Sequence, residues 1–269
     1  MESKPSFFPR EHGATAMLLT PFVSGAILAR VFQWQEIAAL IAIVSLFAMK
    51  EPLIVIARQR WVWRDRHPEV AAAVRWLTAE IVLMAVGGMA LLWTGPALEY
   101  SILFAGAVLF STITVWVHVH NRQRSTIFQV VSAMALTSTS LVAALSATGR
   151  IQSWTWALWG LLAAQATAGI FTVHARIDAR VAAKNPAHPN LARRPARICA
   201  VALLLGSITA VWFAHYEVAA GLLLVASSYL WDLRRQGDPE SLKMPLTKVG
   251  LRALAFSLVY AALMIAGLW

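Results

Sequence analysis

Stretches of apolar residues, each about as long as a membrane-spanning helix, follow one another along this chain. They occupy residues 14–31, 37–57, 74–93, 101–118, 127–147, 154–173, 198–214, 216–231 and 251–269. Only 13% of the residues are charged, whereas a soluble domain carries about a quarter. With a mean hydropathy of +0.63, this composition excludes a water-soluble globule and a disordered chain. The sequence therefore predicts a single transmembrane domain over residues 1–269, an all-α polytopic bundle of nine transmembrane helices.

The boundary between the seventh and eighth stretches is the weakest, because no Gly or Pro marks a turn there. A single helix over residues 198–231 would be about 51 Å long, which exceeds the thickness of a bilayer. We therefore expect a tight hairpin at residues 214–217, with one helix on each side.

The basic residues give the predicted bundle an orientation. If the nine stretches alternate in direction, 21 of the 23 Lys and Arg residues fall on the side of the N-terminus, and only Arg30 and Arg150 fall on the other. Because cytoplasmic loops are enriched in Lys and Arg, this distribution predicts an N-in, C-out, multi-pass protein of the cell inner (plasma) membrane. It also explains the net charge of +10, so we expect a lipid bilayer as partner and no nucleic acid.

The second stretch contains two adjacent ionisable residues and a proline, Lys50, Glu51 and Pro52. Charges inside a membrane are costly and usually face a partner in the bundle interior, so we expect a pair with another helix, for example with Glu80 or Arg10. Pro52 lacks an N–H group, which predicts a kink and a free backbone carbonyl one turn earlier. The alternative is a helix that ends early, with Lys50 reaching the lipid headgroups.

Further polar residues gather at the predicted cytoplasmic ends of the first, second, fourth and sixth stretches. His118 and Arg122 share one helical face, as do His174 and Asp178, because each pair is spaced i, i+4. We expect these ends to converge on one cytoplasm-facing cavity that binds an anionic or lipid-phosphate ligand. The candidate ligand-binding residues are Arg10, Glu11, His12, Lys50, Glu51, His118, Arg122, His174, Arg176 and Asp178.

Two other interpretations of these polar ends stay open. Interfacial Arg and His residues also contact lipid phosphate without forming a site. Two His residues and Asp178 could instead hold a metal, but no H-E-x-x-H or comparable spacing occurs, so no metal ligand is assigned.

The chain reads PREHGA at residues 9–14, directly before an apolar stretch with Pro21 and Gly25. This opening resembles the P-[RK]-E-H-G-A motif of the YwiC-like membrane proteins. The hydropathy of most of the chain and the basic, polar ends of the fourth and sixth stretches are also similar to that family. The resemblance implies a polytopic membrane protein and no particular reaction.

The architecture is also similar, more distantly, to the UbiA superfamily of intramembrane prenyltransferases. That resemblance implies a UbiA-like bundle and an isoprenoid-type ligand, which family members bind through Mg²⁺ held by two Asp-rich motifs. Here the first motif position carries Lys50, Glu51 and Pro52, and the second carries Asp178 alone between Arg176 and Arg180. A diphosphate–Mg²⁺ site needs several carboxylates, so Arg and Lys would have to hold an anionic headgroup directly.

The sequence thus favours a membrane protein that binds an anionic or lipid-phosphate ligand in a cytoplasm-facing cavity with degenerate UbiA-type motifs. It identifies no cofactor, and it leaves open whether the protein is an enzyme. A small-solute transporter is an alternative, although no internal repeat supports it. A non-catalytic scaffold or assembly factor is another, in which the ionisable residues would be structural.

The charge distribution yields a topology prediction. Residues 58–75 and 176–197 should face the cytoplasm, and Trp269 should face outside. In a Cys199→Ala background, a single cysteine at position 188 should be protected from impermeant thiol reagents added to intact cells. Labelling of that cysteine from the outer side would contradict the nine-helix count.

Overall fold

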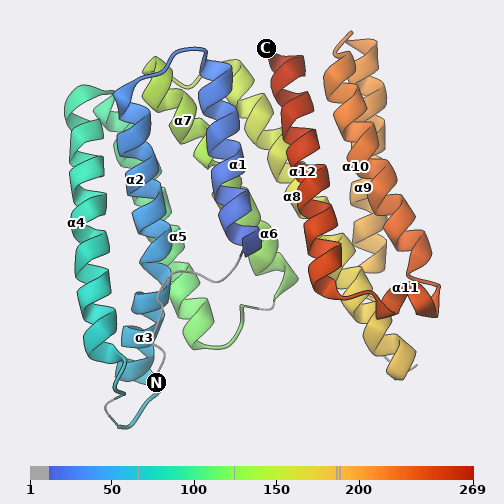
Figure 1. Ribbon diagram of the computed structural model, residues 1–269, viewed down its shortest axis with the longest axis horizontal. Helices are drawn as coiled ribbons and strands as arrows, with labels where there is room; N and C mark the ends of the chain where they lie inside the picture. Colours follow the sequence, from blue (N-terminus) through green and yellow to red (C-terminus); the bar gives the residue numbers. More distant parts are fainter. Residues whose placement is uncertain (1–11, 66, 124, 186, 188) are drawn as a thin grey trace.

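A computed structural model describes residues 12–269 apart from residues 66, 124, 186 and 188. This described part contains twelve helices and no strand (Figure 1). The helices are α1 (His12–Ala29), α2 (Trp34–Ala48), α3 (Lys50–Trp61), α4 (Val70–Thr94), α5 (Ala97–Val119), α6 (Thr126–Thr137), α7 (Thr139–Thr148), α8 (Ser153–Lys184), α9 (Arg193–Trp212), α10 (Tyr216–Arg235), α11 (Pro239–Lys243) and α12 (Leu246–Leu268). The all-α prediction is confirmed for these residues.

Seven helices in the described part are long and apolar enough to cross a membrane, when α2 with α3 and α6 with α7 are each taken as one. The protein is therefore a multi-pass membrane protein. The two remaining predicted spans correspond to α1, which is shorter, and to α10, which carries Glu217 and Asp232 within its bounds. The count of nine stays a prediction.

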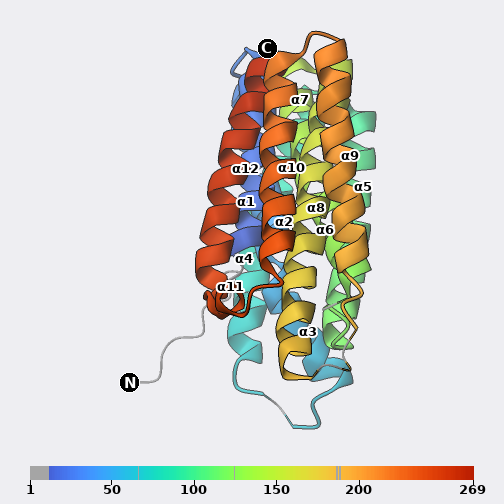
Figure 2. The same cartoon turned by 90° about the vertical axis from the view of Figure 1, so that its right-hand side faces the viewer.

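The helices run back and forth between two ends of the bundle, with their axes roughly parallel (Figures 1 and 2). The loops that follow α3, α5, α8 and α10 lie at the lower end of Figure 1, and the C-terminus lies at the upper end. At the upper end, the guanidinium of Arg30 lies 4.2 Å from the ring centre of Trp269 and joins the first loop to the last helix. The charge argument assumed the same alternation in helix direction. The orientation of the bundle relative to the cytoplasm stays a prediction.

Two helical passes are interrupted, each for an identifiable chemical reason. α2 ends at Ala48 and α3 begins at Lys50, because Pro52 has no N–H group to donate to the Ala48 carbonyl. The sequence predicted this kink. The second interruption, at Ser138 between α6 and α7, was not predicted. Hydroxyl groups at residues 137–140 all donate to backbone carbonyls of the preceding turn, and such bonds bend helices.

The buried side chains form two main clusters, one in each half of the chain. The first gathers around Phe22, Ala39, Leu91 and Leu145 and joins α1, α2, α4, α5 and α7. The second gathers residues of α8, α9, α10 and α12, with Leu28 from α1. Because α1 packs against both α7 and α12, it stands between the two halves of the bundle (Figure 1).

Glycines permit the closest helix contacts. A Cβ atom at Gly25 would lie 2.6 Å from the Ser140 carbonyl oxygen, and one at Gly87 would lie 2.7 Å from the Ala38 carbonyl oxygen. Both contacts involve backbone, which cannot move aside easily. Small residues at such crossings let transmembrane helices approach one another closely.

This contact predicts different effects for two adjacent glycines of α4. Gly87→Ala should lower the melting temperature in detergent, because overpacking against the backbone of α2 costs about 1–3 kcal/mol. Gly88→Ala is the matched control, since its Cβ atom meets nothing within 4 Å and Ala favours a helix. Equal melting temperatures for the two variants would contradict the close approach of α2 and α4.

Candidate functional site

A cavity of about 660 Å³ lies between the N-terminal half of the bundle and α8. We call it the wide cavity. α1, α2, α5, α6 and α7 supply most of its wall, with Lys50 from α3, Gln123 from the loop before α6, and Ile170 from α8. Among the described residues of the predicted site, Lys50 and His118 line this cavity, and the convergence of the four polar helix ends stays a prediction.

The wide cavity is polar at one end and apolar along most of its length. On α5, the lining runs from Ile102 and Gly106 through Phe110 to Thr114 and His118, which is almost the whole length of the helix. Lys50 is the first residue of α3, His118 lies in the last turn of α5, and Gln123 lies in the loop that follows α5. The remaining length is mostly lined by aliphatic and aromatic side chains of α1, α2, α5 and α6.

Lys50 is held at the polar end by its neighbour. Only 12% of its side chain is exposed, and its Nζ atom lies 3.8 Å from Oε1 of Glu51. The described ion pair thus joins these two residues, and the predicted pair with another helix stays a prediction. The interruption at Met49 places Lys50 at the start of α3, where the chain resumes its helix beside the cavity.

His118 is fixed by both backbone and aromatic contacts. Its Nδ1–H donates to the Thr114 carbonyl at 2.8 Å, and its own carbonyl accepts from Arg58 at 3.5 Å. The His118 ring meets Phe128 of α6 edge-on, with 6.0 Å between ring centres, and Phe128 also stacks with Phe110 at 6.4 Å. These rings close the polar end of the cavity between α5 and α6.

His174 does not line the wide cavity, but it forms a hydrogen bond with Gln129, which does. Its Nε2–H donates to Gln129 Oε1 at 2.9 Å, so its Nδ1 is the acceptor for the Thr126 hydroxyl at 3.4 Å. Gln129 in turn donates to the Gln123 carbonyl at 3.5 Å. This chain of bonds ties α8 to α6 and orients a side chain that lines the wide cavity.

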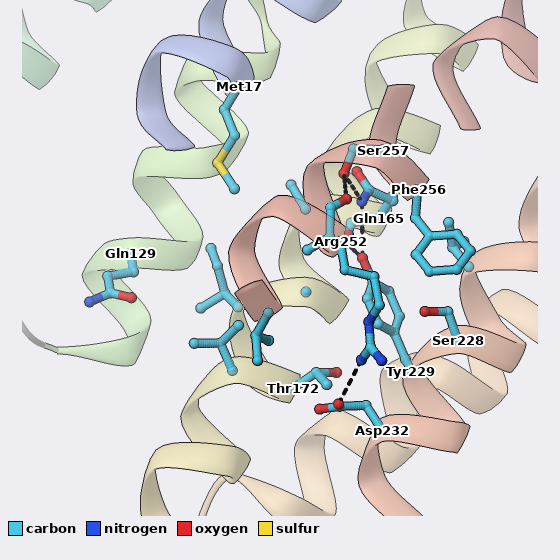
Figure 3. A pocket seen from close by; sticks show the side chains of 17 residues that line it. Met17, Gln129, Gln165, Thr172, Ser228, Tyr229, Asp232, Arg252, Phe256 and Ser257 are labelled. Atoms are coloured by element: carbon cyan, nitrogen blue, oxygen red, sulfur yellow. Dashed lines mark hydrogen bonds and ion pairs between the residues drawn. The ribbon is translucent and has the colours of Figure 1, made fainter. Parts of the chain in front are cut away.

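A second cavity of about 210 Å³ lies between α8, α10 and α12, and we call it the narrow cavity (Figure 3). Met17, Gln129 and Ile170 line both cavities, so the two lie side by side. Tyr229 and Gln165 contribute buried polar groups to the narrow cavity. The Gln165 amide donates to the Tyr229 hydroxyl at 2.9 Å and to Ser257 at 2.8 Å.

A buried charge cluster lies at the edge of the narrow cavity. Asp232 Oδ1 accepts from Arg176 and from Arg252, each at 2.9 Å (the Arg252 bond is drawn in Figure 3). Arg176 is 2% exposed and also donates to the Ser241 carbonyl in α11. Three helices, α8, α10 and α12, are therefore joined at one carboxylate.

The other predicted site residues are spread out. Arg122 is exposed in the loop after α5. Asp178 Oδ2 accepts the backbone N–H of Ala192 at 3.2 Å, directly before α9 begins. Arg10 and Glu11 lie outside the described residues, and so does the side chain of His12.

Sequence reasoning missed Asp232, Arg252 and the glutamines. Arg252 counted only as one of the basic charges on the side of the N-terminus, whereas α12 begins at Leu246 and carries it into the bundle. The available signal was an acid directly after an apolar stretch, at Asp232, followed by a basic residue at the start of the next one. Nothing in the sequence marked Gln123, Gln129 or Gln165 as cavity residues.

Over the residues that the structure describes, no group of three or more His, Cys, Asp and Glu side chains could hold a metal ion. What the wide cavity does offer is the Lys50 ammonium group and glutamine amides beside an apolar channel. That donor set suits hydrogen bonding to an anionic group.

The charge cluster predicts a large effect for one substitution. Asp232→Asn should destabilise the protein by about 3–5 kcal/mol, because it leaves two guanidinium groups, one of them buried, without their counter-charge. Glu240→Gln is the control, since Glu240 pairs with Lys243 at 2.6 Å but the pair is about three-quarters exposed and contributes less than about 1 kcal/mol. Thermal unfolding in detergent measures both, and similar losses in the two variants would contradict the bridging role of Asp232.

A comparison with known families matches the description "YwiC-like protein" over residues 8–145, slightly more than half of the chain. The matched segment covers α1 to α6 and most of α7, which build most of the wall of the wide cavity. No curated protein and no solved structure matches the chain. With this match, the chain belongs to the YwiC-like family.

Proposed function

We propose that this YwiC-like membrane protein binds an amphiphile with an anionic, phosphate-type headgroup and an apolar tail in the wide cavity. The observation that carries the proposal is the polarity of that cavity. Lys50, His118 and Gln123 lie at one end, and a mostly apolar channel runs along α5. An ammonium group binds phosphate as a point charge, and apolar walls exclude water from a hydrocarbon chain.

Size and access support a lipid-like ligand. A volume of about 660 Å³ falls inside the ~300–1,000 Å³ range of pockets that bind small molecules and cofactors. Ile102 and Gly106 line the cavity and are also exposed on the outside of the bundle. The channel therefore has an opening on its α5 side through which a tail can enter from the bilayer.

The remaining predicted residues find places around this headgroup site. Gly13 and Ala14 line the wide cavity, so Arg10, Glu11 and His12 directly precede its wall, and we propose that they complete the polar end. Four further residues would act around the headgroup. Glu51 would act through Lys50, and His174 through Gln129. Arg122 and Asp178 would act at the mouth of the cavity. Arg176 is engaged with Asp232 and is not part of this proposal.

We further propose nine membrane spans with the N-terminus inside, so that the headgroup binds at the cytoplasmic side. A likeness to the UbiA superfamily would fit this arrangement, and no reaction is assigned from it. The carboxylates near the cavity are few and isolated, so direct contacts from Lys50 and nearby basic groups would hold the anion.

The proposal predicts binding that depends on both ends of the ligand. Farnesyl phosphate should bind the purified protein with EDTA present, and farnesol, which lacks the phosphate, should bind at least tenfold more weakly. Lys50→Met should weaken farnesyl phosphate binding about tenfold, because a charged hydrogen bond contributes ~1.5–3 kcal/mol. Gly106→Leu should weaken both ligands, because its side chain would enter a channel that is open at this position.

Matched controls separate these effects from general damage. Lys248→Met removes an exposed cation of α12, and Gly160→Leu adds bulk at an exposed glycine of α8 with nothing within 4 Å. Both should bind like the original protein in native mass spectrometry. If farnesyl phosphate does not bind, or if Lys50→Met and Lys248→Met behave alike, the proposal is wrong and the transporter and scaffold alternatives take its place.

A further inference from the structure

The narrow cavity carries a charge imbalance. The two Asp232 oxygens are occupied, Oδ1 by Arg176 and Arg252 and Oδ2 by the Gln236 amide at 3.4 Å. Asp232 therefore has little remaining capacity to accept a ligand's hydrogen bonds. Two guanidinium groups against one carboxylate leave one net positive charge, in surroundings where an uncompensated charge is costly.

Two side chains of this cavity offer hydrogen-bond donors. Arg252 is about one-third exposed, lines the cavity and gives a single described hydrogen bond through Nη2, although a guanidinium has five N–H groups. Ser228 on α10 also lines the cavity, and its hydroxyl makes no hydrogen bond to the residues that the structure describes. Figure 3 shows both side chains on the same side of the cavity, near Asp232 and opposite Met17 and Gln129.

Gln165, Tyr229 and Ser257 are bonded to one another, much of the remaining wall is apolar, and the space is small. Phe256, Val225, Val249 and Ala253 supply much of the lining. The volume of about 210 Å³ is below the ~300–1,000 Å³ of pockets for drug-sized ligands. The cavity therefore fits a short molecule with one polar end and one apolar end.

We infer that the narrow cavity binds a small monocarboxylate, held by Arg252 and Ser228, with its short apolar part against Phe256. A carboxylate matches the planar guanidinium fork and can accept two parallel hydrogen bonds. One negative charge balances the net positive charge of the cluster, whereas a phosphate dianion would exceed it. This inference stands on residues of α10 and α12 and does not rest on the proposed lipid site.

Calorimetric titration of the full-length protein in phosphatidylcholine nanodiscs tests the inference, with butyrate as the probe. Butyrate should bind once per chain and saturably, and neutral butyramide should bind at least tenfold more weakly. Ser228→Ala should weaken butyrate binding about fivefold through the lost hydrogen bond. Ser228→Leu should abolish it, because its side chain would fill the cavity.

The neighbouring residue provides the matched control. Ser227 is exposed on the same helix, so Ser227→Leu should bind butyrate normally. Arg252→Gln should also lose butyrate binding. If this variant does not fold, the comparison of the Ser227 and Ser228 variants tests the inference by itself. Absence of saturable butyrate binding, equal binding of butyramide, tighter binding of inorganic phosphate, or equal losses at Ser227 and Ser228 would each overturn the inference.

Discussion

The C-terminal half of this bundle depends on one buried carboxylate. Asp232 on α10 accepts from Arg176 on α8 and from Arg252 on α12, and Arg176 also donates to the carbonyl of Ser241 in α11. In a membrane, where apolar side chains gain little by leaving lipid, such polar contacts and close van der Waals packing hold helices together. The geometry of the cluster also determines which N–H donors of Arg252 are not used by Asp232. Arg252 lines the narrow cavity.

The N-terminal half is organised by a different constraint, the interruption of helices beside a cavity. α2 and α3 are separated because Pro52 cannot donate a hydrogen bond, and α6 and α7 are separated where four consecutive hydroxyl residues bond to the backbone. Lys50 and Ser138, which lie at these interruptions, both line the wide cavity. In membrane proteins, irregular backbone is tolerated where it borders a cavity or is buried in protein, and here both interruptions meet that condition.

The two halves meet around α1 and share part of their cavity walls. Met17 of α1, Gln129 of α6 and Ile170 of α8 line both cavities. The match to the YwiC-like family ends at residue 145, so it covers most of the wide cavity and leaves the Asp232 cluster outside. His174 joins the halves directly, since it lies on α8 and positions Gln129 through a hydrogen bond.

The sequence by itself determined the all-α membrane class, the approximate helix positions, the helix interruption before Pro52 and the family. The first three follow from local properties, namely the length of apolar stretches and a missing N–H group, and the family match lies in residues 8–145. The hairpin at residues 214–217 belongs with them, because α9 ends at Trp212 and α10 begins at Tyr216.

Only the tertiary structure decided which polar residues meet. The sequence placed Arg176 and Asp178 in one candidate site, yet Arg176 pairs with Asp232, 56 residues away, and Asp178 accepts from the backbone before α9. Helical spacing tells which side chains share a face, but it does not tell which other helix that face meets. In this protein the partner is chosen by how α8, α10 and α12 pack, and that packing is a property of the whole bundle.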